Sequence, residues 1–329
     1  VSPRCAMAGR MNDSSSAGPS APSVADLLRG ELAQGDVILS TARPILRHLL
    51  ANDNHALFSD EVIARIRGMM VHLAWQMLFE LAAELGIDDR GAFVAEREEA
   101  LATSLLEDAA FLGHAHALTI EAQMAERLSA RSGIDPVLSP LMQELAASDD
   151  EGLAEAAMRV IAAQARYMQK VRRMELPLEE LPAELFHAAT TALKRSQDDL
   201  GSEAMAVCDR LRENHDEGER RIGQMMRLVM AMKPDASRAL SVDHAGLSLF
   251  STALAMACEQ ERDAVILSLG ENQCARLAIS LRAAGLEQSA VEQQFLYLHP
   301  EISLPEGFSS LRADRAVELL SAAASGTAH

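Results

Sequence analysis

The chain has 329 residues and is acidic, with 30 lysine and arginine residues, 48 aspartate and glutamate residues and a net charge of −18. This charge disfavours nucleic acid and anionic membrane surfaces as partners, because both are bound through clustered basic side chains. Aromatic residues make up 3% of the chain, so few side chains can stack on bases. Hydrophobic residues make up 49%, enough for a sizeable core, and the length predicts one large or two ordinary domains.

The N-terminal segment differs in composition from the rest of the chain. Residues 12–23 are almost all small or polar and include two prolines, so they bury too little surface to offset their ordering entropy. We therefore expect residues 1–23 to be a disordered tail. The chain shows no secretory signal pattern, no apolar run of eighteen residues and no metal-binding spacing among its four cysteines, which predicts a cytoplasmic protein with reduced thiols.

From residue 24 onward, apolar residues recur every three to four positions, which is the period of an amphipathic helix. The clearest case is residues 59–85, where Ser59 suits the N-cap and Gly86 suits the left-handed position after the helix. The same period predicts helices over residues 92–107, 119–131, 136–147, 151–175, 182–194, 202–232, 241–258, 271–284, 288–298 and 312–324. The strand-like run at 265–269 is too short to build a sheet, so the sequence predicts an all-α fold.

Three glycines punctuate this helical pattern in the same way. Gly86, Gly133 and Gly285 each follow a predicted helix and precede an apolar residue and then an acidic one. Gly86 and Gly133 are 47 residues apart, close to the period of HEAT-like helical pairs. We expect stacked helical hairpins, either HEAT-like or in an irregular array, although ordinary helix caps explain the glycines equally well.

Prolines at positions 177 and 182 mark the clearest interruption, because the residue before a proline avoids the helical conformation. The sequence therefore predicts an N-terminal helical lobe at residues 24–176 and a C-terminal helical lobe at residues 177–329. Each lobe would have about 150 residues, an ordinary domain length.

The C-terminal third carries a helix-and-glycine rhythm in residues 275–286 and 293–300. In these residues the chain resembles an all-helical bacterial family known only as a domain of unknown function. The resemblance implies helical hairpins and provides no activity and no functional residue.

One short pattern has the form of a metal site. Glu184 and His187 make a Glu-x-x-His step, which puts two potential ligands on one helix face, as in carboxylate-bridged di-iron bundles. A second such step is missing from the chain, so an incidental surface pair is the ordinary alternative. His114 and His116 are two residues apart and would point in different directions on a helix, so we expect helix-end or buried histidines there.

His215 is followed by two acidic residues, as is the phosphate-accepting histidine of signalling helices. A neighbouring carboxylate can hold the imidazole in one tautomer, which makes a phosphotransfer role a second alternative. The flanking residues 210–221 are almost wholly polar, so a charged surface turn explains the pattern as well.

Two groups of residues favour contact with another macromolecule. Met225, Met226, Met230 and Met232 crowd one short segment, and methionine adapts to varied partner shapes. Arg166, Lys170 and Arg173 follow helical spacing and could meet an acidic partner. The ordinary alternatives are a core stripe for the methionines and a solvated face for the basic residues.

No pattern in the chain assembles a nucleophile, a base and an oxyanion hole. The sequence therefore predicts a non-enzymatic cytoplasmic protein without a cofactor, which acts through contact with another protein or with a second copy of the chain. The alternatives are a metal-binding enzyme through Glu184 and His187, and a phosphotransfer protein through His215.

Overall fold

The computed structural model describes residues 23–51, 60–197, 200–270 and 273–326. The secondary structure in these ranges is helical, as predicted, and no strand occurs in them. The α-helices are α1 (Val24–Ala51), α2 (Asp60–Glu84), α3 (Arg90–Glu107), α4 (Ala109–Ser132), α5 (Pro140–Ala146), α6 (Glu151–Arg172), α7 (Ala183–Ser196), α8 (Gly201–Glu213), α9 (Arg221–Ala231), α10 (Val242–Ala245), α11 (Leu247–Ala257), α12 (Arg262–Ser268), α13 (Cys274–Ala283), α14 (Gln288–Leu298) and α15 (Ala313–Gly326). Short 3-10 helices are η1 (Leu178–Glu180), η3 (Lys233–Leu240) and η5 (Phe308–Ser310).

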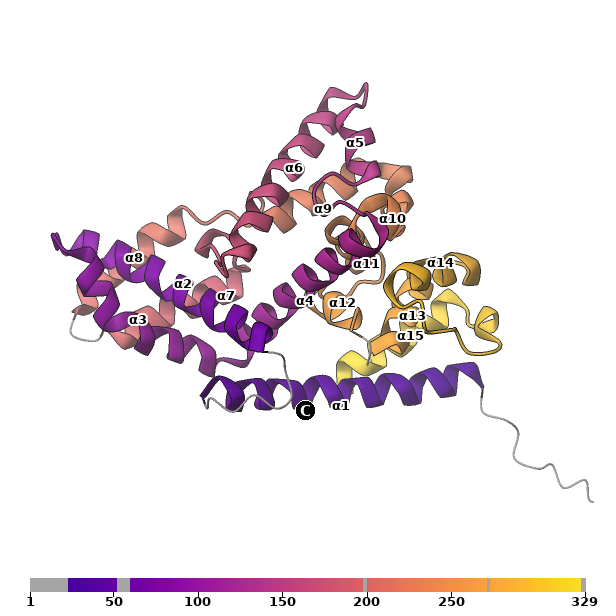
Figure 1. Ribbon diagram of the computed structural model, residues 1–329, viewed down its shortest axis with the longest axis horizontal. Coiled ribbons are helices and arrows are strands. Elements are labelled where there is room, and N and C mark those ends of the chain that lie inside the picture. Colours follow the sequence, from indigo (N-terminus) through magenta and orange to yellow (C-terminus); the bar gives the residue numbers. More distant parts are fainter. Residues whose placement is uncertain (1–22, 52–59, 198–199, 271–272, 327–329) are drawn as a thin grey trace, which may run out of the picture.

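The helices gather around two hydrophobic cores (Figure 1). The first core lies among α2, α3, α7 and α8, and the second lies among α5 and α9 to α15. Three long helices reach both cores: α1 lies along one side of the molecule, α4 lies at the centre, and α6 runs from the α5 end toward the centre. Along α4, for example, Leu112 and Leu118 belong to the first core, whereas Met124 and Leu128 belong to the second.

The two cores do not coincide with the predicted lobes on either side of residue 177. The first core takes residues from both sides of Pro177, including Leu73 of α2 and Leu193 of α7. The second core likewise combines Leu128 of α4 with Phe250 of α11. The cores therefore interleave along the sequence and share the three long helices.

The three predicted glycine caps are confirmed. Gly86, Gly133 and Gly285 have φ angles of 66°, 67° and 91°, in the left-handed region that favours glycine. In each case the amide of the next residue reaches back to a carbonyl in the last helical turn, at 3.0 Å from Ile87, 3.4 Å from Ile134 and 3.1 Å from Leu286. These bonds satisfy carbonyls that the helix ends would otherwise leave unpaired.

Several predicted helix boundaries are wrong. The segment 202–232 forms two helices, α8 and α9, with a turn over residues 214–220, and the segment 241–258 is divided at Gly246, which has a φ of 72°. The segment 151–175 ends early, because Met174 has a φ of 59° and leaves the helical conformation. The strand-like run at 265–269 lies mostly within α12.

Some predictions fall on residues without a described structure. The predicted disordered tail at 1–23 lies outside the described residues apart from Ser23, and so does the predicted N-cap at Ser59. Within the described ranges, no helix combines the length and apolar character needed to cross a membrane. Cys208, Cys258 and Cys274 are not in disulfides, and burial raises the pKa of Cys258 to about 11.

Candidate functional site

A buried carboxylate lies where the two cores meet. Glu121 occupies the middle of α4, one turn after Leu118 of the first core and one turn before Met124 of the second. Its side chain is 1% exposed. A buried charge is costly unless it is paired and hydrogen-bonded, so its partners determine whether the fold tolerates it.

Two arginines hold this carboxylate, each with two hydrogen bonds. Arg221, the first residue of α9, donates from Nη1 to Oε1 at 2.8 Å and from Nη2 to Oε2 at 3.1 Å. Arg262, the first residue of α12, donates from Nη2 to Oε1 at 2.8 Å and from Nη1 to Oε2 at 3.0 Å. Paired guanidinium–carboxylate bonds are among the stronger hydrogen bonds in proteins, so Glu121 joins α4, α9 and α12.

Neutral side chains complete this arrangement, which we call the Glu121 cluster (Glu121, Gln164, Tyr167, Arg221, Ser248, Thr252 and Arg262). The hydroxyl of Ser248 donates to Glu121 Oε1 at 2.6 Å, and Gln164 Oε1 accepts from Arg221 Nη1 at 3.0 Å. The ring of Tyr167 lies 3.5 Å from the guanidinium carbon of Arg221, a cation–π contact. Arg262 Nε donates to the Thr252 hydroxyl at 3.0 Å.

The cluster keeps Glu121 ionised. Burial by itself opposes ionisation, but the charges of Arg221 and Arg262 and their hydrogen bonds outweigh it and hold the pKa of Glu121 well below its ordinary value of 4.5. In the unfolded chain the carboxyl titrates near that ordinary value. The stabilisation from Glu121 is therefore complete above the ordinary value and is lost as the pH falls toward the lower pKa of the folded state.

This shift predicts how stability depends on pH. Between about pH 5 and pH 2, we expect the free energy of unfolding of the native chain to fall more steeply than that of Glu121→Gln, which cannot titrate at this position. Urea denaturation at a series of pH values measures both slopes. Equal slopes would show that Glu121 has the same pKa in the folded and unfolded states.

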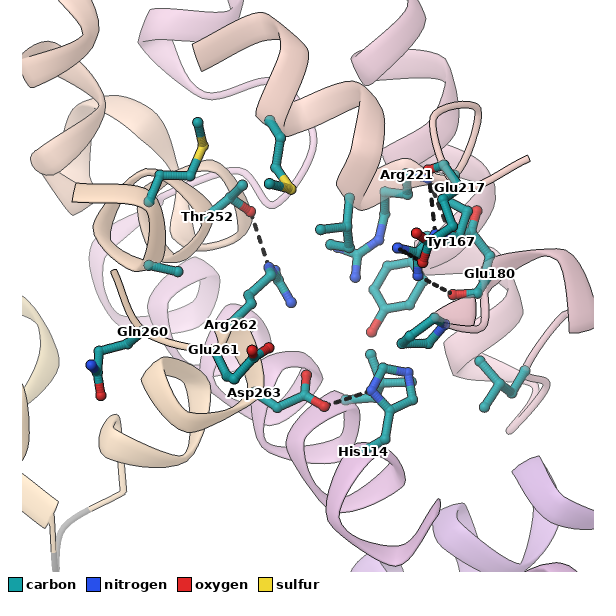
Figure 2. A pocket seen from close by; sticks show the side chains of 18 residues that line it. His114, Tyr167, Glu180, Glu217, Arg221, Thr252, Gln260, Glu261, Arg262 and Asp263 are labelled. Carbon is teal, nitrogen blue, oxygen red and sulfur yellow. Dashed lines mark hydrogen bonds and ion pairs between the residues drawn. The ribbon is translucent and has the colours of Figure 1, made fainter. Parts of the chain in front are cut away.

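A cleft of about 410 Å³ opens beside the cluster (Figure 2). Arg221, Arg262, Tyr167 and Thr252 line its inner part, and the apolar lining consists of Leu118, Leu176, Pro182, Ile222, Met226, Ala255 and Met256. The volume lies within the usual range for small-ligand sites, and the mixture of apolar walls and a few polar groups is typical of them.

Acidic side chains surround the cleft. Glu180, Glu217, Glu261 and Asp263 belong to its lining. Glu217 pairs with Arg220 at 3.0 Å, and Asp263 accepts a hydrogen bond from Nδ1 of His114 at 2.7 Å. The contact between His114 and Asp263 joins α4 to α12 at the edge of the cleft (Figure 2). The prediction that His114 is a helix-end or buried residue is partly met, since its side chain on α4 is 11% exposed.

The four methionines predicted as a binding surface divide into two pairs. Met225 and Met232 are buried in the second core, whereas Met226 and Met230 are 41% and 61% exposed. Met226 also lines the cleft. The structure therefore places half of the predicted methionine group in the core and half on the surface of α9.

The three predicted basic residues lie in the C-terminal half of α6 and at its C-cap. Arg166 and Arg173 are exposed, and Lys170 pairs with Glu175 at 3.2 Å. Arg173 is the residue that follows the last turn of α6, where positive charge is favoured by the helix dipole. None of the three lines the cleft.

The residues of the two alternative sites lie elsewhere. Glu184 and His187 are exposed on α7, and the described residues contain no group of three or more histidine, cysteine or acidic residues placed to hold a metal ion. His215 lies in the turn between α8 and α9, where its Nε2 is 3.0 Å from the carbonyl oxygen of Leu181 and its ring stacks on Phe186 at 4.1 Å. The Nε2 atom of His215 therefore contacts the backbone and is not free to accept a phosphate group.

No pattern in the sequence predicts the Glu121 cluster as a whole. A signal for its central residue is present in the sequence, because Glu121 shares a helical stripe with the apolar residues Ala117, Met124 and Leu128. Arg221 and Arg262 give no such signal, since both lie in polar stretches that are typical of a surface.

Comparison with known proteins adds no assignment. The resemblance of the C-terminal third to a helical bacterial family therefore stays a prediction. The chain matches no protein-family model, no curated protein and no solved structure.

Proposed function

We propose that the chain is a non-enzymatic protein that acts by binding another protein through the exposed face of α9 and the adjoining cleft. The observation that carries this proposal is the position of Met226 and Met230. They are one helical turn apart on α9, both side chains are exposed, and Met226 also lines the cleft. Methionine side chains are flexible and polarisable, so they suit a surface that adapts to a partner.

The cleft supports the proposal from a second side. A protein interface draws its affinity from side chains that enter well-formed pockets, and exposed contacts around them add little. Here the exposed methionines adjoin a cleft of about 410 Å³, so a partner that covers α9 could insert a side chain beside it. The expected cytoplasmic location and the absence of a recognisable catalytic motif in the sequence agree with this role.

A site-specific photo-cross-linker on the full-length chain tests the proposal. Placed at position 230 and irradiated in the native cells, it should attach the chain to one partner protein. Met205 on α8 is the matched control, because it is a methionine with 53% exposure and does not line the cleft. Identical products from positions 205 and 230, or no product from position 230, would contradict the proposal.

The partner found in this way permits a quantitative prediction. We expect Met230→Asp to weaken its binding by about tenfold or more, because a charge would replace an apolar contact at the centre of the interface. We expect Met205→Asp to leave the dissociation constant unchanged within about twofold, as for a surface position away from the interface. Isothermal titration calorimetry with the purified partner measures both constants.

A further inference from the structure

The three arginines at the cleft already bind carboxylates of the protein itself. Arg221 and Arg262 each bind Glu121 twice, and Arg220 pairs with Glu217. An incoming anion would have to compete with these carboxylates. The four carboxylates of the lining, together with Glu121, outnumber the three arginines, so the cleft has little capacity to bind an anion.

The two carboxylates that flank Arg262 are less fully engaged. Asp263 accepts its hydrogen bond from the neutral or protonated ring of His114. For Glu261, which is exposed, the described residues provide no side-chain hydrogen bond or ion pair. These two side chains come from the start of α12 and lie close to Arg262 in the view into the cleft (Figure 2). They leave an excess of negative charge at this side of the opening.

A buried hydroxyl faces the same space. Tyr167 is 5% exposed, and its hydroxyl has no hydrogen-bond partner among the described residues. Figure 2 shows this hydroxyl directed away from Arg221, into the space bordered by His114, Arg262 and Asp263. Burial of an unpaired polar atom destabilises a fold, which makes such an atom a candidate for a ligand contact.

Burial also raises the pKa of Tyr167 above its ordinary value of 10.0, and the charge of Glu121 adds to this effect. The hydroxyl is therefore neutral at physiological pH. A neutral phenol can accept a hydrogen bond from an ammonium or guanidinium group.

The walls of the cleft suit a side chain with an apolar stem and a charged end. Ile222, Met226 and Met256 provide apolar surface from α9 and α11, and Leu176 provides it from the segment after α6. Lysine and arginine bury their methylene stems along such surfaces while keeping the charged group in a polar environment. Within the polar part of the lining, Glu261, Asp263 and the hydroxyl of Tyr167 are the groups suited to a cation.

We propose that the cleft binds a lysine or arginine side chain of the partner protein, with the cation at Glu261, Asp263 and the Tyr167 hydroxyl. The methylene stem then packs against Met226 and Met256. This inference rests on the proposed function, because it assigns the partner's contact within the same surface. It adds that the partner segment at the cleft is basic, which the charge of −18 on this chain also favours.

Methionine methyl groups provide a direct test with the full-length chain. In a spectrum of ¹³C-methyl-labelled methionine, Met226 and Met256 report on the cleft, and Met205 serves as an internal control outside it. The probes are three capped amino acids: Nα-acetyl-lysine methylamide, the norleucine analogue with the same stem and no charge, and the glutamate analogue. We expect the lysine probe to shift the Met226 and Met256 signals and to bind about fivefold more tightly than the norleucine probe.

Two variants and a matched control test the roles of the Tyr167 hydroxyl and the Glu261 carboxylate in binding the lysine probe. We expect Tyr167→Phe to weaken lysine binding by about threefold to tenfold while leaving the melting temperature unchanged or raised, since it removes a hydroxyl without a partner. We expect Glu261→Gln to weaken it by about fivefold, and Glu301→Gln to have no effect because Glu301 does not line the cleft. If Tyr167 has only a structural role, Tyr167→Phe should lower the melting temperature and leave probe binding unchanged.

The outcomes separate this inference from the function on which it rests. Equal binding of the lysine and norleucine probes, or tighter binding of the glutamate probe, would overturn the inference. Spermidine bound about tenfold more tightly than the lysine probe would indicate a free amine as the ligand and would overturn the partner side chain as the occupant. If cross-linking from position 230 succeeds and every probe fails, the proposed function stands without this inference.

Discussion

Glu121→Gln is expected to lower the free energy of unfolding by about 3–5 kcal/mol, the usual cost of removing one member of a buried ion pair. The native carboxylate is 1% exposed and faces two guanidinium groups, of which that of Arg221 is also 1% exposed. A glutamine of the same size keeps the packing but leaves both positive charges without a countercharge. Urea denaturation of the purified chain at neutral pH measures the loss.

Glu126→Gln is the matched control for this prediction. Glu126 lies on the same helix, is 44% exposed and contacts Arg65 at 3.5 Å. We expect this change to cost at most about 1 kcal/mol, because exposed ion pairs contribute little to stability. Similar losses in the two variants would contradict the view that burial and double pairing distinguish Glu121.

A combined replacement separates the structural from the functional role of the charges. When Glu121, Arg221 and Arg262 are all replaced by methionine, no unpaired charge remains, and we expect most of the lost stability to return. Apolar side chains of similar volume would fill the junction of the two cores, and the remaining loss would come from Gln164 and Ser248, which lose their bonds to Arg221 and Glu121. A stable triple variant that no longer binds the partner cross-linked from position 230 would therefore indicate that the charges are kept for binding.

The sequence predicts helices well where one face of the helix is continuously apolar. The segment 59–85 illustrates this, since α2 covers Asp60–Glu84 and most of its large apolar residues are buried, whereas Trp75 is 41% exposed. The prediction of one helix over 202–232 is wrong because polar side chains in the middle of this segment stabilise a turn. Asp216 Oδ1 accepts a hydrogen bond from the amide of Gly218 at 2.8 Å, and Nε2 of His215 contacts the carbonyl oxygen of Leu181. These contacts compete with helix propagation, and the apolar period does not reveal them.

The candidate site could be predicted only in part for a related reason. A charged residue within an apolar stripe is visible in the sequence at Glu121, but its partners are 100 and 141 residues away along the chain. The packing of α9 and α12 against α4 brings these residues together, and that packing depends on the whole fold. The exposed Met226 and Met230 belong to the group of four methionines that crowd one short segment, but crowding does not show which of the four are buried.

Gly223→Ala is expected to lower the free energy of unfolding by about 1–3 kcal/mol, the usual cost of overpacking at a tightly packed position. A β-carbon at Gly223 would lie 2.2 Å from the carbonyl oxygen of Glu217 and 3.0 Å from that of Gly218. Both contacts are with backbone, so no flexible side chain can move aside. The turn at 214–220 would have to shift away from α9, and it carries Glu217 and Arg220 of the cleft with it.

Gly30→Ala is the control with the opposite expected sign. Gly30 lies within α1, and a β-carbon there would have no neighbour within 4 Å. We expect this variant to gain about 0.5–1 kcal/mol, because alanine restricts the unfolded chain and is favoured in a helix interior. Urea denaturation of both variants should therefore move the midpoint in opposite directions. An increase in the free energy of unfolding of both variants would show that the turn at 214–220 can shift without loss of stability. The close approach of α9 would then not be what holds Glu217 and Arg220 at the cleft.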